Sequence, residues 1–277
     1  MQKILLHAGV AALYAGLALH FWRTRWGVAA RETKVRQSGW RAWERGALAC
    51  GVLAHCGLLV HAILDVGGFR FGFAHALSAM ALLALVFYGI ESLFHTIEGV
   101  PALVLPPSAA CVLLPAFFPG AVTTARATEP AFVAHVVIAM AAYAFIAIAA
   151  VHAILMLVIE RRLQRPARSP APVGLPPLLT MENLLFRILA AGFALLTLTL
   201  VSGVVFSEEI FGRPLRLDHK TVFSLLAWLI FAVLLLGRRA YGWRGRAALN
   251  GTFAGFAMLF LAYIGSRFVL EVVLGRA

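Results

Sequence analysis

Residues 131–159 read AFVAHVVIAMAAYAFIAIAAVHAILMLVI, a run that contains no Lys, Arg, Asp or Glu. A helix of roughly 20 apolar residues crosses the hydrocarbon core of a bilayer, so this run is long enough to span a membrane. Similar apolar runs occur elsewhere in the chain, at 3–22, 46–64, 72–94, 100–118, 184–206, 221–236 and 250–272. The pattern predicts an all-α, polytopic transmembrane bundle of about eight spans.

The composition supports the same class of protein. Of the 277 residues, 62% are apolar and 13% are charged, against roughly 45–50% and 25% in ordinary soluble domains. We therefore expect a single integral membrane domain over residues 1–277, with the lipid bilayer around it. The formal charge of +12 comes from short loops between apolar runs. A nucleic-acid-binding protein needs a basic face on a folded domain, so we expect no nucleic-acid partner.

The distribution of Lys and Arg predicts the orientation. Most of the basic residues lie in the loops 23–45, 160–182 and 237–249, and cytoplasmic loops are enriched in Lys and Arg. With eight spans these three loops share one side, which we expect to be cytoplasmic, and both termini are then periplasmic. The protein is expected in the inner (plasma) membrane of a bacterial cell. Loop 160–182 is rich in Pro and Arg, which is typical of a flexible cytoplasmic linker.

The run at 100–118 is unusual because it contains Pro101, Pro106, Pro107 and Pro115. Proline removes a helix donor and tends to kink a helix. We still expect this run to cross the membrane. If it did not, the Arg-rich loop 160–182 would lie on the outer side.

Histidines are the most informative polar residues. With the predicted topology five of the nine fall near the outer surface, namely His7, His61, His75, His135 and His219. Neutral imidazole is a common axial ligand of haem iron, and it also serves as a proton relay in transporters. The chemistry of histidine leaves both functions open. The chain has no nucleophile–base motif, phosphate-binding loop or Cys/His metal framework, so we expect it not to be an enzyme.

The second half of the chain resembles a known family. Residues 202–271, which begin SGVVFSEEIFGRPLRLDHKTVFSLLAW, and residues 135–157, HVVIAMAAYAFIAIAAVHAILML, are similar to segments of the cytochrome c assembly proteins, including the subfamily of YpjD-like inner membrane proteins. The resemblance extends over 131–272. It implies a protein that binds or handles haem, a non-covalent b-type haem as cofactor, and a role in cytochrome c biogenesis. The implied partners are other cytochrome c maturation components.

The resemblance also implies the site residues. In the family an outward-facing loop forms a platform for haem, and two histidines ligate the iron. His135 matches the first histidine, and the loop 207–220 matches the platform. The chain ends without a second external histidine, so we expect His219 to be the second ligand. Asp218 and Lys220 match the platform motif. Lys220 and two further basic residues, Arg213 and Arg216, would attract the haem propionates.

A second function remains open. The family's platform is rich in tryptophan, whereas the loop 207–220 contains none. A protein with the same helical scaffold and no haem site would be a transporter or an accessory subunit of one. A polar stripe at helical spacing in the third span, Tyr88, Glu91, His95 and Glu98, would then be its transport path. A scaffolding protein without a ligand is a third possibility.

Overall fold

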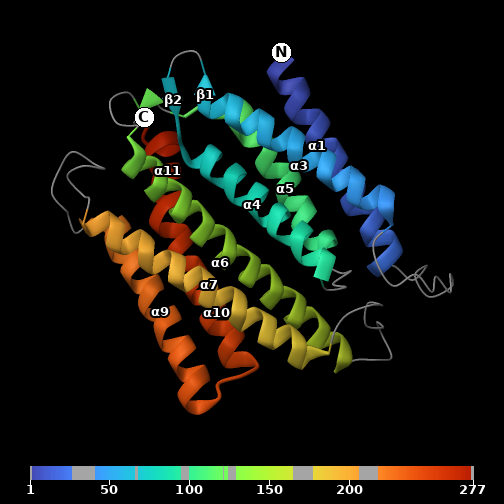
Figure 1. The fold of residues 1–277 in the computed structure, drawn as a ribbon, viewed down its shortest axis with the longest axis vertical. Helices are drawn as coiled ribbons and strands as arrows, with labels where there is room; N and C mark the ends of the chain where they lie inside the picture. The colour runs from blue at the N-terminus through green and yellow to red at the C-terminus, as the bar shows by residue number, and fades with distance from the viewer. Residues whose placement is uncertain are drawn as a thin grey trace.

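The protein is an elongated helical bundle (Figure 1). The computed structural model describes residues 2–26, 41–65, 68–94, 100–120, 122–123, 129–164, 177–205 and 218–275. Within these ranges the chain forms eight long helices: α1 (Gln2–Phe21), α3 (Ala42–Ile63), α4 (Phe73–Phe94), α5 (Pro101–Phe117), α6 (Pro130–Leu163), α7 (Leu178–Val205), α9 (His219–Tyr241) and α10 (Arg246–Phe260). Helix α10 continues through a π-helical turn (Leu261–Gly265) into α11 (Ser266–Phe268) and a second π-helical turn (Val269–Val273).

The predicted all-α membrane class is confirmed. In the described part of the chain, seven helical segments are long and apolar enough to cross a bilayer: Gln2–Arg25, Ala42–Ile63, Phe73–Ile90, Pro130–Arg161, Leu178–Val205, His219–Tyr241 and Arg246–Val273. In a bilayer every backbone polar group needs a partner, and a helix supplies these partners within itself. The apolar runs of the sequence therefore become helices.

Helix α5 is the exception in length. It is apolar and continuous through Pro106, Pro107 and Pro115, but it has 17 residues. At a rise of about 1.5 Å per residue it is roughly 25 Å long, somewhat short of a hydrocarbon core of about 30 Å. Of the eight predicted crossings, seven thus meet the length required and the eighth is a shorter helix.

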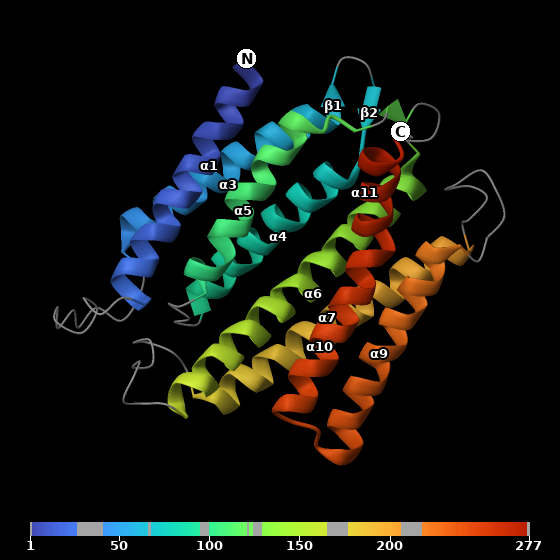
Figure 2. The ribbon, with the colours of Figure 1, turned by 180° about the vertical axis from the view of Figure 1, so that it is seen from behind.

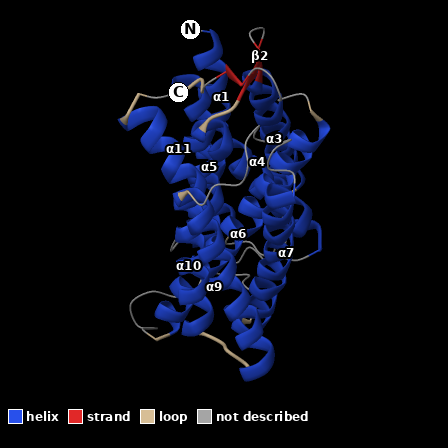
Figure 3. Ribbon diagram, turned by 90° about the vertical axis from the view of Figure 1, so that its left-hand side faces the viewer, coloured by secondary structure: helices blue, strands red, loops and turns tan. Residues whose placement is uncertain are grey.

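A small antiparallel sheet covers one end of the bundle (Figure 3). Its strands are β1 (Leu64–Asp65), β2 (Gly68–Arg70) and β3 (Val122–Thr123), in the order β1-β2-β3. The register pairs Leu64 with Phe69 and Phe69 with Thr123. Both ends of the chain lie at this end of the bundle (Figures 1 and 2). We call it the sheet end; that it faces the periplasm stays a prediction.

Small residues allow the helices to approach closely. Helix α6 packs against α7, α4 and α10, and α1 packs against α5 and α3. At the contact of α6 with α7, a Cβ atom added to Gly192 would lie 3.0 Å from Cγ1 of Ile146 and 3.2 Å from Cβ of Phe145. Ile146 and Leu189 are fully buried. Close backbone approach of this kind replaces the hydrophobic driving force that is absent between helices in lipid.

Buried carboxylates hold the opposite end of the bundle together. Glu44 is fully buried, and its Oε1 lies 2.8 Å from Nε2 of His20. Its Oε2 accepts a hydrogen bond of 2.8 Å from the backbone N–H of Arg41. At the same end, Oε1 of Glu182 in α7 lies 2.8 Å from Nη1 of Arg238 and 3.2 Å from Nε of Arg244. These contacts fix the starts of α3 and α7 relative to their neighbours.

The structure describes the two ends of the predicted linker 160–182. Helix α6 continues to Leu163 and α7 begins at Leu178, so both ends of the range 160–182 are helical. Residues 165–176 lie outside the described residues.

Candidate functional site

Four of the six predicted site residues lie in the described part of the chain, at the sheet end. His135 is in the second turn of α6, His219 and Lys220 begin α9, and Asp218 directly precedes α9. Figure 1 shows the starts of α6 and α9 and the end of α7 near one another. Arg213 and Arg216 lie outside the described residues.

His135 is held by α7. Its Nδ1 lies 2.8 Å from Oγ of Ser202, and the Ser202 hydroxyl lies 3.1 Å from the carbonyl oxygen of Thr199. A hydroxyl has one proton, and the imidazole donates from Nδ1 in the tautomer in which Ser202 gives that proton to Thr199. In that tautomer Nε2 carries the lone pair, which is the form of histidine that binds a metal.

Lys220 points into the bundle. Its Nζ lies 5.1 Å from the centre of the Tyr263 ring, in the π-helical turn after α10. An ammonium group over an aromatic face is attracted by the electrons of the ring. Lys220 is also within electrostatic range of His135. The structure therefore brings a cation close to the predicted ligand.

An aromatic cluster, which we define as Phe71, Tyr143 and Tyr263, lies beneath Lys220. The ring centres of Tyr143 and Tyr263 are 6.3 Å apart, and those of Phe71 and Tyr263 are 6.5 Å apart. Phe71 and Tyr143 are buried. The cluster joins the segment before α4 to α6 and the last helix, so it forms an apolar floor under the sheet end. Nothing in the sequence pattern predicted this cluster.

Asp218 caps helix α9. Its Oδ1 accepts hydrogen bonds from the backbone N–H of Thr221 at 3.0 Å and from the Thr221 hydroxyl at 3.1 Å. Burial opposes ionisation, but these hydrogen bonds and the nearby charges of Lys220 and His219 outweigh it and lower the pKa of Asp218. The carboxylate thus has a structural role at the start of the helix.

His219 differs from Lys220 in orientation. It is the first residue of α9, and its side chain is exposed. The buried face of α9 contains Ala227, Phe231 and Leu234, and Lys220 falls on that face at helical spacing. His219 is therefore accessible to a molecule that approaches the sheet end from outside.

His75, which the sequence grouped with His135 and His219, is a buried polar residue at the same end. His75 in α4 is fully buried, and neither ring nitrogen makes a hydrogen bond of good geometry, although the backbone of Ala62 lies beside the ring. Nearby, Oε1 of Glu271 lies 3.5 Å from Nη1 of Arg267. A Cβ atom added to Gly72 would lie 2.6 Å from Oε2 of Glu271. The Glu271 carboxylate therefore lies directly against the backbone at Gly72.

His55, another buried histidine, has a partner at each ring nitrogen. Nε2 of His55 lies 2.8 Å from Oγ of Ser78, and its Nδ1 lies 3.4 Å from the hydroxyl of Tyr14. These contacts satisfy both ring nitrogens within the first half of the bundle. His55 is therefore a structural residue.

The polar stripe of the third span is only partly described. Tyr88 is buried, with 2% of its surface exposed. His95 and Glu98 lie outside the described residues, and of Glu91 only the backbone is described, within α4. The stripe therefore remains a prediction from the sequence. Among the described residues no group of three or more His, Cys, Asp or Glu side chains is arranged to hold a metal ion.

Comparison with known proteins extends the resemblance seen in the sequence. The sequence model of the cytochrome C assembly protein family matches residues 46–274. The inner membrane protein YpjD of Escherichia coli (strain K12) is 34% identical over 160 residues, which are 58% of this chain and 60% of that protein. The cytochrome c biogenesis protein CcsA of Synechocystis sp. is 33% identical over 108 residues, 39% of this chain and 32% of that protein.

A third relative has no assigned activity. An uncharacterized 28.8 kDa protein of Azospirillum brasilense is 33% identical over 141 residues, 51% of this chain and 52% of that protein. The alignments thus span about 60% or less of the curated relatives' own length. No solved structure matches the chain.

Proposed function

Because the chain belongs to the cytochrome c assembly protein family, we propose that it is an inner-membrane protein that binds haem at the sheet end and assists cytochrome c biogenesis. The predicted family is confirmed, and the seven apolar helices agree with a multi-pass membrane protein. Haem as the bound group, and the steps in which the protein takes part, are the proposal.

The contact of His135 with Ser202 is the observation that supports the proposal most strongly. With distances of 2.8 Å from Nδ1 to the Ser202 hydroxyl and 3.1 Å from that hydroxyl to the Thr199 carbonyl, the tautomer that donates from Nδ1 keeps the lone pair on Nε2. Haem bound here would supply an iron centre that imidazole nitrogens ligate. A hydrogen bond at the far nitrogen orients a metal-binding histidine and raises its basicity. The donor chemistry of His135 therefore fits haem.

Residues near His135 would bind the haem propionates and the second axial position of the iron. Lys220 supplies a positive charge beside His135 and would bind a haem propionate by a charge-assisted hydrogen bond. Asp218 acts indirectly, because it holds the start of α9 and so the position of Lys220. His219 is exposed and available as the second ligand. Arg213 and Arg216 precede it in the chain and would add positive charge.

We propose no bond-making step for the chain itself. Covalent attachment of haem draws on cysteine thiols of a partner cytochrome, and Cys50 and Cys56 of this chain are free and lie within α3. The role of the protein is then to present haem to a partner. Other maturation components, or a transport subunit, would work with it at the membrane surface.

A complementation experiment tests this function in cells. A bacterial strain that lacks the protein is supplied with the wild type, His135→Ala or His61→Ala, and its c-type cytochromes are measured by haem staining of membrane proteins. His61 is an exposed histidine at the sheet end of α3, so it is the matched control. We expect the wild type and His61→Ala to restore the cytochromes and His135→Ala to fail.

Two outcomes would contradict the proposal. Full restoration of the c-type cytochromes by His135→Ala would show that the function does not need this histidine. Loss on Glu91→Gln with no effect of His135→Ala would favour a transport role along the polar stripe of the third span.

A further inference from the structure

The last helix changes its geometry at the residue that Lys220 contacts. Helix α10 passes into a π-helical turn over Leu261–Gly265, and Tyr263 lies at the centre of this turn. Nζ of Lys220 is 5.1 Å from the centre of the Tyr263 ring. Turns of this kind inside α-helices are rare and occur frequently at functional sites. Its position beside the proposed haem site therefore indicates a role there.

Ser266 supports the π-helical turn. In an α-helix its backbone N–H would donate to the carbonyl oxygen of Ala262, whereas here it donates to those of Leu261 and Tyr263. The carbonyl oxygen nearest to the Ser266 hydroxyl is that of Ala262, at 2.6 Å. A serine side chain that bonds to the carbonyl four residues earlier tends to bend a helix. Ser266 thus stabilises the turn that carries Tyr263.

Neighbouring side chains fix the orientation of the Tyr263 ring. The centres of the Phe71 and Tyr143 rings lie 6.5 Å and 6.3 Å from the centre of the Tyr263 ring. The Arg267 side chain lies beside the Tyr263 hydroxyl. These neighbours come from the segment before α4, from α6 and from the last helix, so they restrain the ring from several directions. The ring therefore presents a fixed aromatic face to Lys220.

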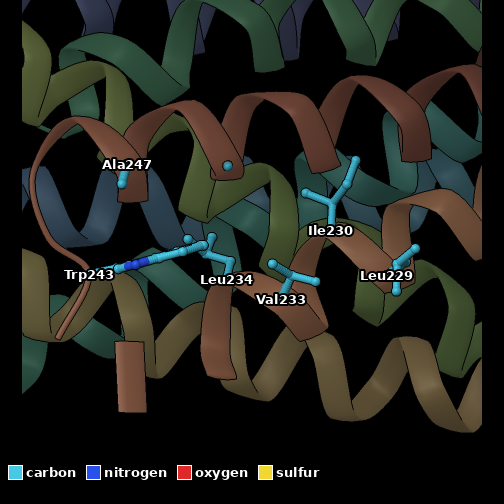
Figure 4. Close-up of a pocket in the computed structure, with 7 residues that line it drawn as sticks. Leu229, Ile230, Val233, Leu234, Trp243 and Ala247 are labelled. Atoms are coloured by element: carbon cyan, nitrogen blue, oxygen red, sulfur yellow. The ribbon is translucent and has the colours of Figure 1, made fainter. Parts of the chain in front are cut away.

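Close packing of α9 on α10 sets the position of Lys220 over this ring. A Cβ atom added to Gly255 of α10 would overlap the Phe231 ring of α9, and one added to Gly251 would lie 3.0 Å from Cδ1 of Leu234. Away from the sheet end, the two helices enclose an apolar pocket that Leu234 helps to line (Figure 4). At the sheet end, α9 packs against the π-helical turn itself. The backbone that carries Lys220 is thus held against the backbone that carries Tyr263.

We propose that Tyr263 is a positioning residue of the haem site, whose ring holds the ammonium group of Lys220 beside His135 for contact with a haem propionate. Lysine has a flexible four-carbon stem, and immobilising such a side chain costs entropy on binding. A ring that holds the ammonium group beforehand lowers this cost. The link to haem rests on the function proposed above, whereas the placement of Lys220 by Tyr263 does not.

Acetylation of lysine measures the placement without haem. The full chain in detergent is treated briefly with acetic anhydride, and mass spectrometry gives the rate at Lys220 relative to Lys3, an exposed lysine of α1. We expect Tyr263→Leu to raise this relative rate about two- to fivefold, because loss of a cation–π contact releases the amine to the reagent. Tyr263→Phe keeps the ring and should restore the wild-type rate.

Tyr241→Leu is the matched control for the acetylation experiment. It removes a tyrosine that is 80% exposed at the other end of α9 and should leave the relative rate unchanged. Equal rates at Lys220 in Tyr263→Leu and wild type would overturn the proposal.

A double-mutant cycle tests the link to haem. Absorption titration gives the haem affinity of wild type, Tyr263→Leu, Lys220→Gln and the double variant. We expect Tyr263→Leu to weaken binding about two- to fivefold when Lys220 is present, and to have no further effect once Lys220 is Gln. An equal loss in both backgrounds would show a general packing role and contradict the proposal. A wild type that binds no haem would refute the proposed function, and the acetylation rates would still decide the placement of Lys220.

Discussion

Nδ1 of His135 in α6 lies 2.8 Å from Oγ of Ser202 in α7, and the Ser202 hydroxyl in turn lies 3.1 Å from the carbonyl oxygen of Thr199. In the tautomer that donates from Nδ1 to Ser202, the lone pair is on Nε2. The contact joins two helices whose residues are 67 positions apart in the chain. It makes Ser202 a positioning residue for the proposed haem ligand.

Replacing Ser202 should weaken haem binding without removing the ligand. Ser202→Ala deletes the acceptor of the Nδ1 proton, and loss of such a partner typically lowers metal affinity about 10–100-fold. Haem titration of the purified protein, followed by its absorption spectrum, measures the effect. Thr199→Ala is the control, because its hydroxyl bonds to Leu195 and its carbonyl remains. Equal affinity in Ser202→Ala and wild type would contradict this role.

Lys220→Gln should reduce the affinity for haem and its dependence on salt. A hydrogen bond to a charged group contributes about 1.5–3 kcal/mol, so the loss is expected to be on the order of tenfold or more. Salt screens such contacts, so the difference between wild type and variant should shrink at high ionic strength. Arg45→Gln removes an exposed charge at the opposite end and serves as control. An effect of Lys220→Gln that salt does not change would argue against a charge contact.

Asp218 is expected to stabilise the start of α9. Asp218→Ala removes the cap and should lower the stability in detergent by about 1 kcal/mol, whereas Asp218→Asn, which also caps well, should lower it less. The pKa of Asp218 is lowered in the folded protein. Its contribution is therefore present above the pKa of an unfolded Asp, about 3.9, and is lost as the pH falls through the folded pKa. Thermal unfolding of wild type and Asp218→Ala should differ at pH 7 and converge in strong acid. A difference that persists in strong acid would exclude the carboxylate as its source.

Gly192 tests the contact of α6 with α7 that positions His135 and Ser202. Gly192→Leu places a side chain against Ile146 and Phe145, where a Cβ alone already lies at 3.0 Å and 3.2 Å. Overpacking of this kind costs about 1–3 kcal/mol, so the unfolding temperature in detergent should fall. Gly57→Leu is the matched control, since a Cβ there has no neighbour within 4 Å. Similar unfolding temperatures for the two variants would contradict the close packing of α6 and α7 at Gly192.

Most of the fold could be predicted from the sequence because the bilayer allows few alternatives. A long apolar run must form a helix in lipid, so the run at 131–159 became α6 (Pro130–Leu163) and the run at 46–64 became α3 (Ala42–Ile63). The helix ends were less predictable, because they lie where water competes for the backbone. The sheet was missed because its strands have two or three residues each.

The site was only partly predictable. His135 came from the resemblance, but its partner Ser202 depends on how α6 and α7 rotate about their axes, which one sequence does not reveal. One signal was overlooked: Lys220, Ala227, Phe231 and Leu234 recur at helical spacing. That pattern places Lys220, rather than His219, on the inner face of α9. The aromatic cluster combines residues from distant segments, so no local pattern could have indicated it.

The absorption spectrum of the purified protein, prepared from cells with ample haem, tests the central claim most directly. The spectrum is compared for wild type, His135→Ala, His219→Ala and His61→Ala. We predict a Soret band in wild type and His61→Ala, and a weaker or shifted band in His135→Ala. A change in His219→Ala would identify it as the second ligand. A spectrum that is the same with and without His135, or a protein that stays colourless after haem is added, would contradict the account.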